Sequence, residues 1–441
     1  MKLNKINTLY FLGIGGIGMS ALARFFLLQK KQVYGYDLTP SEITSQLIAE
    51  GAHIHFEDDV NKIPKNVDIA IYSPAVPKEN AEFQYFLTKS VPMLKRSEIL
   101  GMICHNYPII AIAGTHGKTT TTAMVTQMLC NCRDVACHVS TLSFIGGIAK
   151  NFNSNFVYEP DFDTVIVEAD EFDRSFLTLH PQVAIITSID ADHLDVYGSR
   201  ENMKESFQLF ANQIKPGGTL VIYDEIAEQI AHPNKITYGF SDKATYKISD
   251  FPHFPIPGKH NALNATAAFA ACCEYLKWKN DGIVDVQSLQ AALSQFTGVK
   301  RRFDVRVQRD DFVYIDDYAH HPEAINAFLD AVKNSYPTKK IIGIFQPHLY
   351  SRTKDFAQEF AESLEILDEI ILLDIYPARE EPIEGISSSY LLSLIKNKNK
   401  KLLKKEELID YLQENKPDVL LTMGAGDIDR LVGRIENVEF F

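Results

Sequence analysis

The chain has 441 residues, of which 46% are hydrophobic and 23% are charged, and its net charge at pH 7 is −13. This composition is typical of a soluble globular protein, and the length predicts about three domains. The negative charge argues against a nucleic-acid-binding protein. Because no apolar run reaches about 18 residues, we expect no membrane-spanning segment.

The beginning of the chain and its cysteines indicate the compartment. Lys2 and Lys5 precede a short apolar stretch, as in a secretory signal peptide. No small-residue cleavage site follows, however, and a glycine-rich turn comes next. The six cysteines have no paired CxxC spacing, which predicts reduced thiols. We therefore expect a cytoplasmic protein.

The first predicted unit opens with an apolar strand, a glycine-rich turn (GIGGIG, residues 13–18) and a helix with apolar residues at helical spacing. A second strand ends in Asp37, and a proline at position 74 stops a third. This order predicts a Rossmann-like domain over residues 1–105. The strands are expected at residues 9–12, 33–37 and 69–74, and the helix at residues 19–29.

The second unit begins with an apolar strand at residues 108–113, followed by the loop GTHGKTT and a helix to about residue 130. Such a turn directs several backbone N–H groups at one point, which makes a cradle for phosphates. Lys118 would face solvent and reach the phosphates of a nucleotide, and the Thr119 hydroxyl would contact Mg²⁺. The common phosphate-loop pattern has a glycine where this chain has Ile112, so only its Gly-Lys-Thr half is present.

Acidic residues follow two further strands of this unit. The segments EADEFD (168–173) and SIDADHLD (188–195) both begin where an apolar run stops. Because ligands of α/β folds gather at the carboxyl ends of parallel strands, we expect Glu168 and His193 to bind Mg²⁺ together with Thr119. Acidic loops without a ligand are the alternative. The strands are expected at residues 164–167, 183–187 and 219–223.

The central unit, predicted over residues 106–296, ends with two helical patterns. In GKHNALNA (258–265), Asn261 and Asn264 share one helix face. We expect Asn261 to cap the helix, which is compatible with a nucleotide contact. A second helix is predicted at residues 286–293.

The third unit, residues 297–441, opens with the cation-rich motif GVKRRFD. Arginine suits bidentate contact with a phosphoryl group, whereas an isolated cluster of cations would be surface charge. The motifs DDYAHHPE (316–323) and QPHLYSRT (346–353) each follow a strand. A zinc site could be built from three histidines, but no thiolate supports it. The strands are expected at residues 312–315, 340–345, 370–374 and 419–423, and the histidines are His320, His321 and His348.

These motifs occur in this order between about Tyr10 and Asp429. Because of them, the chain resembles the Mur ligase family, most of all its alanine-adding branch. The resemblance implies three α/β domains: a Rossmann-like domain for the UDP-sugar, a central phosphate-loop ATPase domain with a mostly parallel sheet, and a C-terminal Rossmann-like domain. It also implies a reaction that uses ATP and Mg²⁺. The lactyl carboxylate of UDP-N-acetylmuramate would be joined to L-alanine through an acyl phosphate, in peptidoglycan precursor synthesis.

The resemblance also implies roles for individual residues. The UDP-substrate would contact Gly15, Gly16, Ile17 and Ser73. ATP would contact Gly114, Thr115, His116, Gly117, Lys118, Thr119, Thr120, Asn264, Arg302 and Asp317. The metal ligands would be Thr119, Glu168 and His193, and Tyr318, His348 and Arg352 would lie near the new amide. Catalysis would depend on Lys118, Glu168, His193, Arg302, His348 and Arg352.

Two departures from the family pattern stand out. Many relatives carry a carbamylated lysine where this chain has ESFQL (205–209), and the stretch between Tyr246 and Gly258 is shorter than expected. Other interpretations are a murein-peptide ligase, a more distant folate-polyglutamate synthase, an oxidoreductase that uses Asp37 as the ribose acceptor, and a non-catalytic nucleotide-binding module. We expect a monomer or a homodimer.

Overall fold

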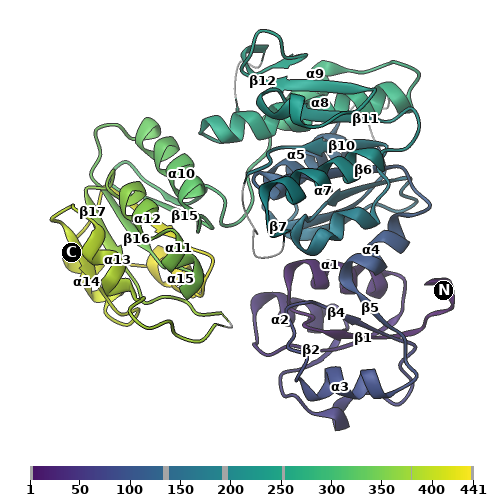
Figure 1. Ribbon diagram of the computed structural model, residues 1–441, viewed down its shortest axis with the longest axis horizontal. Helices are drawn as coiled ribbons and strands as arrows, with labels where there is room; N and C mark the ends of the chain where they lie inside the picture. The colour runs from purple at the N-terminus through teal and green to yellow at the C-terminus, as the bar shows by residue number, and fades with distance from the viewer. Residues whose placement is uncertain (1–2, 133–138, 191–196, 251–253, 379, 439–441) are drawn as a thin grey trace. The chain divides into compact units, whose positions relative to one another are not determined.

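The computed structural model describes residues 3–132, 139–190, 197–250, 254–378 and 380–438 (Figure 1). Three sheets, each mostly parallel, carry the fold, which confirms the predicted α/β class. The chain forms two compact units, one of Met1–His253 with Leu263–Phe296 and one of Phe254–Ala262 with Thr297–Phe441. Within the described ranges, no helix is both long and apolar enough to cross a membrane.

The first sheet has five parallel strands in the order β3-β2-β1-β4-β5. β1 is buried on both faces, because Leu9 and Phe11 pack in one core and Tyr10 and Leu12 in another. Figure 1 shows α1 and α4 on one face of this sheet and α3 on the other. The strands are β1 (Thr8–Leu12), β2 (Gln32–Tyr36), β3 (His53–His55), β4 (Ile69–Tyr72) and β5 (Met93–Lys95). The helices are α1 (Ile17–Leu28), α2 (Glu42–Ala49), α3 (Ala81–Thr88) and α4 (Arg96–Cys104).

The second sheet has eight strands in the order β13-β12-β11-β10-β6-β9-β7-β8. All neighbours pair in parallel except β7 and β8, an antiparallel pair that the sequence motifs did not indicate. The strands are β6 (Ile109–Ala113), β7 (Thr141–Ala149), β8 (Ser154–Tyr158), β9 (Thr164–Glu168), β10 (Val183–Ile186), β11 (Thr219–Tyr223), β12 (Lys235–Gly239) and β13 (Tyr246–Lys247). The helices are α5 (Lys118–Asn131), α7 (Arg200–Asn212), α8 (Lys259–Lys279) and α9 (Val286–Ser294), with a 3-10 segment, η3 (Phe172–Thr178).

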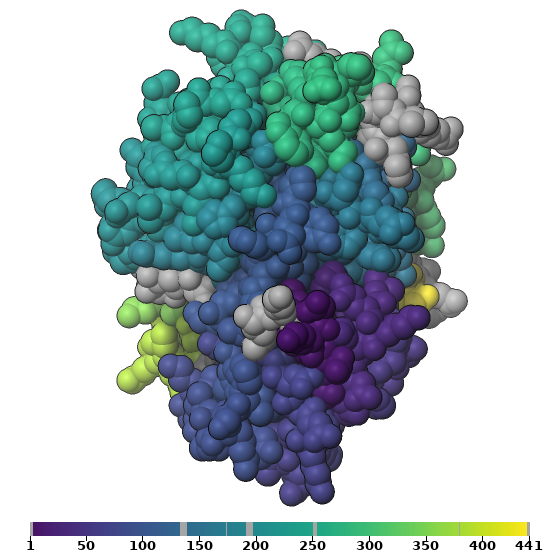
Figure 2. All heavy atoms as spheres, turned by 90° about the vertical axis from the view of Figure 1, so that its right-hand side faces the viewer, coloured from purple at the N-terminus to yellow at the C-terminus, as the bar shows by residue number. Residues whose placement is uncertain are grey.

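The first two sheets belong to one unit and share a hydrophobic core. Helix α1 packs on β7 and β8, and helix α4 packs on η3. The rings of Phe25 and Phe144 meet at this junction, with centroids 6.2 Å apart. In Figure 2 the purple and blue spheres of the first sheet's domain lie directly against the teal spheres of the second. The loops of both sheets can therefore contribute to one site.

The third sheet has six strands in the order β14-β15-β19-β16-β17-β18, and only β14 is antiparallel to its neighbour. β15 pairs with β19 as far as Asp317. Asp316 and Asp317 therefore lie inside a strand, whereas the sequence placed them after it. The strands are β14 (Asp304–Gln308), β15 (Val313–Asp317), β16 (Ile341–Phe345), β17 (Glu369–Leu372), β18 (Lys400–Leu402) and β19 (Val419–Met423). The helices are α10 (Pro322–Ser335), α11 (Tyr350–Asp355), α12 (Ala357–Leu364), α13 (Ser388–Leu394), α14 (Leu408–Glu414) and α15 (Asp429–Glu436).

A buried carboxyl group lies between β1 and α3 in the first domain. The Tyr10 hydroxyl donates to Glu82 and lies 2.8 Å from His55 Nε2, and the Asp59 amide donates to Glu82 Oε1 at 3.1 Å. Burial raises the pKa of Glu82 to about 7, although the hydrogen bond from Tyr10 opposes this shift. The pKa of Glu82 therefore lies above its ordinary value of 4.5.

We expect this group to make folding stability depend on pH. Because the folded-state pKa of Glu82 is raised, its contribution is fully present below pH 4.5 and is lost as the pH rises through about 7. Relative to Glu82→Gln, the unfolding free energy of the wild type should fall by about 2 kcal/mol between about pH 5.5 and about pH 8. Urea unfolding of both proteins at the two pH values checks this. A constant difference would contradict it.

Candidate active site

The phosphate loop connects β6 to α5 and needs glycine at two positions. Gly114 has a φ of 130°, and a Cβ there would lie 2.0 Å from Thr187 Oγ1. Gly117 caps α5 with a φ of 81°, and a Cβ there would lie 2.3 Å from Asn264 Oδ1. Any side chain would therefore be strained and would clash. Because these two positions carry no side chain, the backbone of the loop comes close to its neighbours and does not cover the start of α5.

The loop after β10 supports the phosphate loop. The hydroxyl oxygens of Thr115 and Ser188 lie 2.7 Å apart, and the His116 amide donates to Ser188 Oγ at 3.0 Å. Thr115 also donates to Asp190 Oδ2 at 3.2 Å. The segment after β10 therefore lies at the same sheet edge, as its motif predicted. His193, the predicted metal ligand in this segment, lies outside the described residues.

Lys118 is not solvent-facing, so that prediction was wrong. Its ammonium group forms an ion pair with Glu171 at 2.7 Å and donates to the Gly114 carbonyl at 2.7 Å. The side chains of Lys118 and Glu171 are only 14% and 1% exposed. Burial acts to lower the pKa of Lys118, but the carboxylates of Glu171, Asp170 and Glu168 outweigh it and raise this pKa. Lys118 is therefore a charged residue held in place before any phosphate arrives.

Two predicted metal ligands meet beside this lysine. Thr119 Oγ1 donates to Glu168 Oε1 at 3.1 Å, and the Gly146 amide donates to Glu168 Oε2 at 2.8 Å. Burial raises the pKa of Glu168, and the charge of Lys118 opposes this shift. A hydroxyl and a carboxylate at this spacing are hard oxygen ligands suited to Mg²⁺. Thr120 follows in the first turn of α5 and is buried.

The asparagine pair in α8 has a different arrangement from the one expected. α8 begins at Lys259, so Asn261 lies inside the helix and does not cap it. The Asn261 side chain instead donates to the Pro257 carbonyl at 2.6 Å. Asn264 is buried, and its Oδ1 lies against Gly117. Of the two amides, Asn264 is thus the one beside the phosphate loop.

In the first domain, the glycine-rich turn follows β1 at the point where the strand order reverses, a common ligand position in such sheets. The Gly15 amide donates to Asp37 Oδ2 at 2.7 Å. Asp37, the ribose acceptor of the oxidoreductase interpretation, is therefore hydrogen-bonded to the turn itself.

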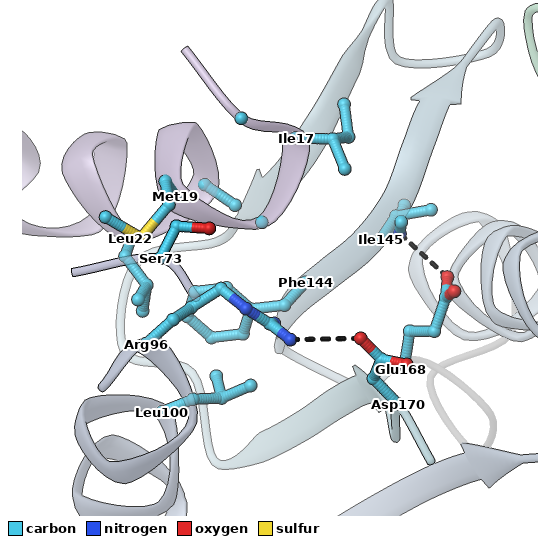
Figure 3. A pocket seen from close by; sticks show the side chains of 14 residues that line it. Ile17, Met19, Leu22, Ser73, Arg96, Leu100, Phe144, Ile145, Glu168 and Asp170 are labelled. Atoms are coloured by element: carbon cyan, nitrogen blue, oxygen red, sulfur yellow. Dashed lines mark hydrogen bonds and ion pairs between the residues drawn. The ribbon is translucent and has the colours of Figure 1, made fainter. Parts of the chain in front are cut away.

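A cavity of about 260 Å³ extends from this turn to Glu168, one member of the metal-ligand pair. Arg96, at the start of α4, reaches Asp170 at 3.2 Å inside the cavity (Figure 3). Gly16, Ile17 and Ser73, which the sequence assigned to substrate, share it with Glu168. The complete lining is Gly16, Ile17, Gly18, Met19, Ala21, Leu22, Ser73, Arg96, Leu100, Phe144, Ile145, Gly146, Glu168 and Asp170.

The third-sheet unit gathers its cations around one tyrosine. The guanidinium groups of Arg301 and Arg302 lie 5.2 Å and 4.9 Å from the centre of the Tyr318 ring. Asp317 accepts the amides of Phe303 at 2.6 Å and Ala319 at 2.8 Å. Burial raises the pKa of Asp317 to about 6, against the charge of Arg302.

His348 and Arg352 lie in the same unit, with Nδ1 and Nη1 3.5 Å apart. Burial, with help from Arg352, lowers the pKa of His348 to about 4, so its imidazole is neutral at pH 7. The His348 ring stacks on Tyr376, with centroids 5.8 Å apart. The ligating atoms of His320, His321 and His348 do not all lie within 4.8 Å of one another, so the zinc alternative has no support.

All three sheets match the same family. Residues 8–108 match the Mur ligase family, catalytic domain, residues 112–272 the Mur ligase middle domain, and residues 301–426 the Mur ligase, glutamate ligase domain. A relative named UDP-N-acetylmuramate–L-alanine ligase, from Flavobacterium psychrophilum, is 46% identical over 456 residues and covers 99% of both chains. The chain belongs to the Mur ligase family.

Solved Mur ligases have the same fold. The crystal structure of UDP-N-acetylmuramate–alanine ligase from Thermotoga maritima has a TM-score of 0.82 and 28% identity, covering 97% of each chain. A murein peptide ligase from Psychrobacter arcticus has a TM-score of 0.72 at 21% identity, covering 99% of this chain and all of that one. The three-domain α/β architecture predicted from the motifs is therefore confirmed.

The sequence assigned no individual role to four residues that make polar contacts in the site of this Mur ligase: Arg96, Asp170, Glu171 and Gly146. Arg96 directly follows β5, so the rule that selected Glu168, a charged residue at the carboxyl end of a parallel strand, would also have selected it. Glu171 belongs to the EADEFD motif, but the sequence alone does not show that it pairs with Lys118. Gly146 acts through its backbone amide, for which the sequence has no signal.

Proposed function

We propose that the protein is a cytoplasmic ligase that joins L-alanine to the lactyl carboxylate of UDP-N-acetylmuramate at the expense of ATP, in peptidoglycan precursor synthesis. Relatives that carry this ligase's name and cover nearly the whole chain support the proposal. The comparisons support neither a murein-peptide ligase nor a dinucleotide-dependent oxidoreductase.

One observation carries the proposal: the glycine-rich turn of the first domain and the Glu168 carboxylate line one cavity. A pyrophosphate suits the backbone amides of a turn that leads into a helix N-terminus. Arg96 adds a guanidinium group to the same cavity, and guanidinium binds phosphate or carboxylate in bidentate fashion. A sugar nucleotide held there would bring its carboxylate towards Thr119 and Lys118.

The described residues also fit ATP and Mg²⁺. The glycines and the first turn of α5 would hold the phosphates, Lys118 would contact the terminal phosphoryl group, and Asn264 would contact the base. Thr119 and Glu168 would hold Mg²⁺, with His193 as the proposed third ligand. When bound, Mg²⁺ would neutralise charge on the phosphate oxygens.

The chemistry then follows from the poor electrophilicity of a carboxylate. A carboxylate oxygen attacks the terminal phosphorus of ATP, and ADP leaves. The neutral amine of alanine attacks the acyl phosphate, loses a proton, and expels inorganic phosphate from the tetrahedral intermediate. Catalysis of this kind depends on positioning and on stabilisation of charge. We assign charge stabilisation near the new amide to Arg352, and positioning there to Tyr318 and His348. Arg302 and Asp317 would contact the phosphate and the ribose of ATP.

Phosphate release tests the proposal. With ATP, Mg²⁺ and UDP-N-acetylmuramate, we expect L-alanine to support turnover at least about tenfold better, in kcat/KM, than any other amino acid. A pocket that fits one methyl group excludes larger side chains, and glycine loses the binding energy of that methyl group, which is worth about tenfold or more. A preference for the tripeptide L-alanyl-γ-D-glutamyl-meso-diaminopimelate would instead indicate a murein-peptide ligase. Calorimetric titration with NADH and with UDP-N-acetylmuramate distinguishes the ligase from the oxidoreductase, because an oxidoreductase requires tight binding of NADH and no binding of the sugar nucleotide.

A further inference from the structure

Asn155, on β8 of the central domain, is completely buried and hydrogen-bonds to the first domain. Its side-chain amide donates to the Ile17 carbonyl at 2.5 Å and to Ser20 Oγ at 3.0 Å. Both acceptors belong to the first turn of α1, and Ile17 lines the cavity. The central domain therefore holds the helix end that follows the glycine-rich turn.

Arg24, one turn further along α1, uses the other end of the same amide. Its Nη1 donates to Asn155 Oδ1 at 2.5 Å, and its Nε lies 3.0 Å from both carboxylate oxygens of Glu50. Its Nη2 donates to Gln46 Oε1 at 3.0 Å. The Arg24 side chain is only 8% exposed and that of Glu50 is 41% exposed, so the bond to the buried Asn155 is the one that forms in surroundings poor in water. Arg24 thus joins α1, α2 and β8 in one network.

The hairpin that carries Asn155 also carries the amide that holds the Glu168 carboxylate. Gly146, on β7, donates to Glu168 Oε2 at 2.8 Å. Phe144, on the same strand, pairs with Phe156, the neighbour of Asn155. Phe144, Ile145 and Gly146 form one wall of the cavity, and Figure 3 shows this strand passing between Ile17 and Glu168.

We propose that Asn155 and Arg24 are positioning residues that set the sugar-nucleotide turn in register with the Thr119–Glu168 pair. They act through Ile17 and α1 and need not touch the substrate. The inference rests on the proposed function, because it assumes that the turn binds the sugar nucleotide. Rates of group transfer fall steeply when reacting atoms are misplaced by about 1 Å. A buried hydrogen-bonded link between the two domains restricts such a displacement at the N-terminal end of α1, in addition to the Arg96–Asp170 ion pair and the apolar packing at the same junction.

The test is the substitution Asn155→Ala. We expect the KM for UDP-N-acetylmuramate to rise about tenfold or more and kcat to fall, while the KM for ATP stays within about twofold, because the phosphate loop does not depend on this bond. Steady-state kinetics with each substrate varied in turn, together with calorimetric binding of UDP-N-acetylmuramate, measures both effects.

Tyr275→Phe is the matched control. It removes a buried hydrogen bond, 2.6 Å from the Tyr275 hydroxyl to Thr164 Oγ1, within the central domain and away from the cavity lining. We expect Tyr275→Phe to lose about as much thermal stability as Asn155→Ala, without a change in the KM for UDP-N-acetylmuramate. A purely structural role for Asn155 would make the two variants alike, and that result would overturn the proposal.

Asn155→Asp provides a second variant if Asn155→Ala folds poorly. This variant keeps an oxygen that accepts the hydrogen bond from Arg24. It removes the N–H group that donates to the Ile17 carbonyl and to Ser20 Oγ. The rise in KM for UDP-N-acetylmuramate should persist, and wild-type values of KM and binding here would also overturn the proposal. Wild-type protein that does not turn over UDP-N-acetylmuramate with L-alanine would instead refute the proposed function, and the inference with it.

Discussion

Lys118→Ala is expected to abolish turnover and also to destabilise the protein. The loss of turnover, on the order of 10³-fold, follows from removing the cation that would contact the transferring phosphoryl group. The loss of stability follows from Glu171, whose side chain is 1% exposed and would lose its ammonium partner. Removing one member of a buried ion pair lowers the unfolding free energy by about 3–5 kcal/mol. Phosphate release and urea unfolding, measured on the same preparation, check both parts.

The double variant Lys118→Met with Glu171→Leu separates the two effects. Replacing a buried ion pair with apolar groups of similar volume is often neutral or stabilising, so we expect near wild-type stability without turnover. Turnover like that of the wild type in Lys118→Ala would refute the assignment of the phosphate loop. Wild-type stability in Lys118→Ala would show that the pair with Glu171 contributes little to folding.

Glu168→Gln is expected to reduce Mg²⁺-dependent turnover by about 10²-fold or more, because an amide is a much weaker ligand for a hard cation than a carboxylate. Metal-free stability should stay the same or rise. The glutamine can still accept the Gly146 amide, and it removes a carboxylate whose burial is unfavourable, as the raised pKa of Glu168 shows. Turnover at increasing Mg²⁺ concentration and thermal unfolding in chelator measure the two quantities.

Glu159→Gln is the control for this substitution. Glu159 also accepts a backbone amide, from Thr141 at 2.9 Å, and lies 3.5 Å from the Thr141 hydroxyl, but it does not line the cavity. Its substitution should leave the Mg²⁺ dependence unchanged. A large loss of metal-free stability in Glu168→Gln, with Mg²⁺ dependence unchanged, would assign Glu168 a structural role.

The sequence predicted the strands that position the site because parallel strands covered on both faces are continuous apolar runs. β6 is buried along all five residues, and it was recognised together with the loop that follows it. β7 was not recognised. Its nine residues include Gly146 and Gly147, and its burial falls off at that point, so neither an unbroken apolar run nor a strict alternation marks it.

Site residues were predictable where a motif or a strand end fixed their position. They were not predictable where their exposure or hydrogen bonding depends on a partner distant in sequence. Thr119 and Glu168 came from their motifs. Lys118 was expected in solvent because its partner, Glu171, lies 53 positions away in the chain. Asn261 was expected to cap a helix that in fact begins two residues earlier.

The division of α8 between the two units has a consequence for the order of synthesis. Residues 254–262 pack with the third-sheet unit, although the rest of α8 belongs to the other one. His260 is half-buried there, and this burial together with Arg302 lowers its pKa to about 4. The ribosome synthesises this segment before residues 297–441. The first turn of α8 therefore cannot pack with its unit until that unit has been translated. A fragment that begins at residue 297 therefore lacks a segment that belongs to its own compact unit.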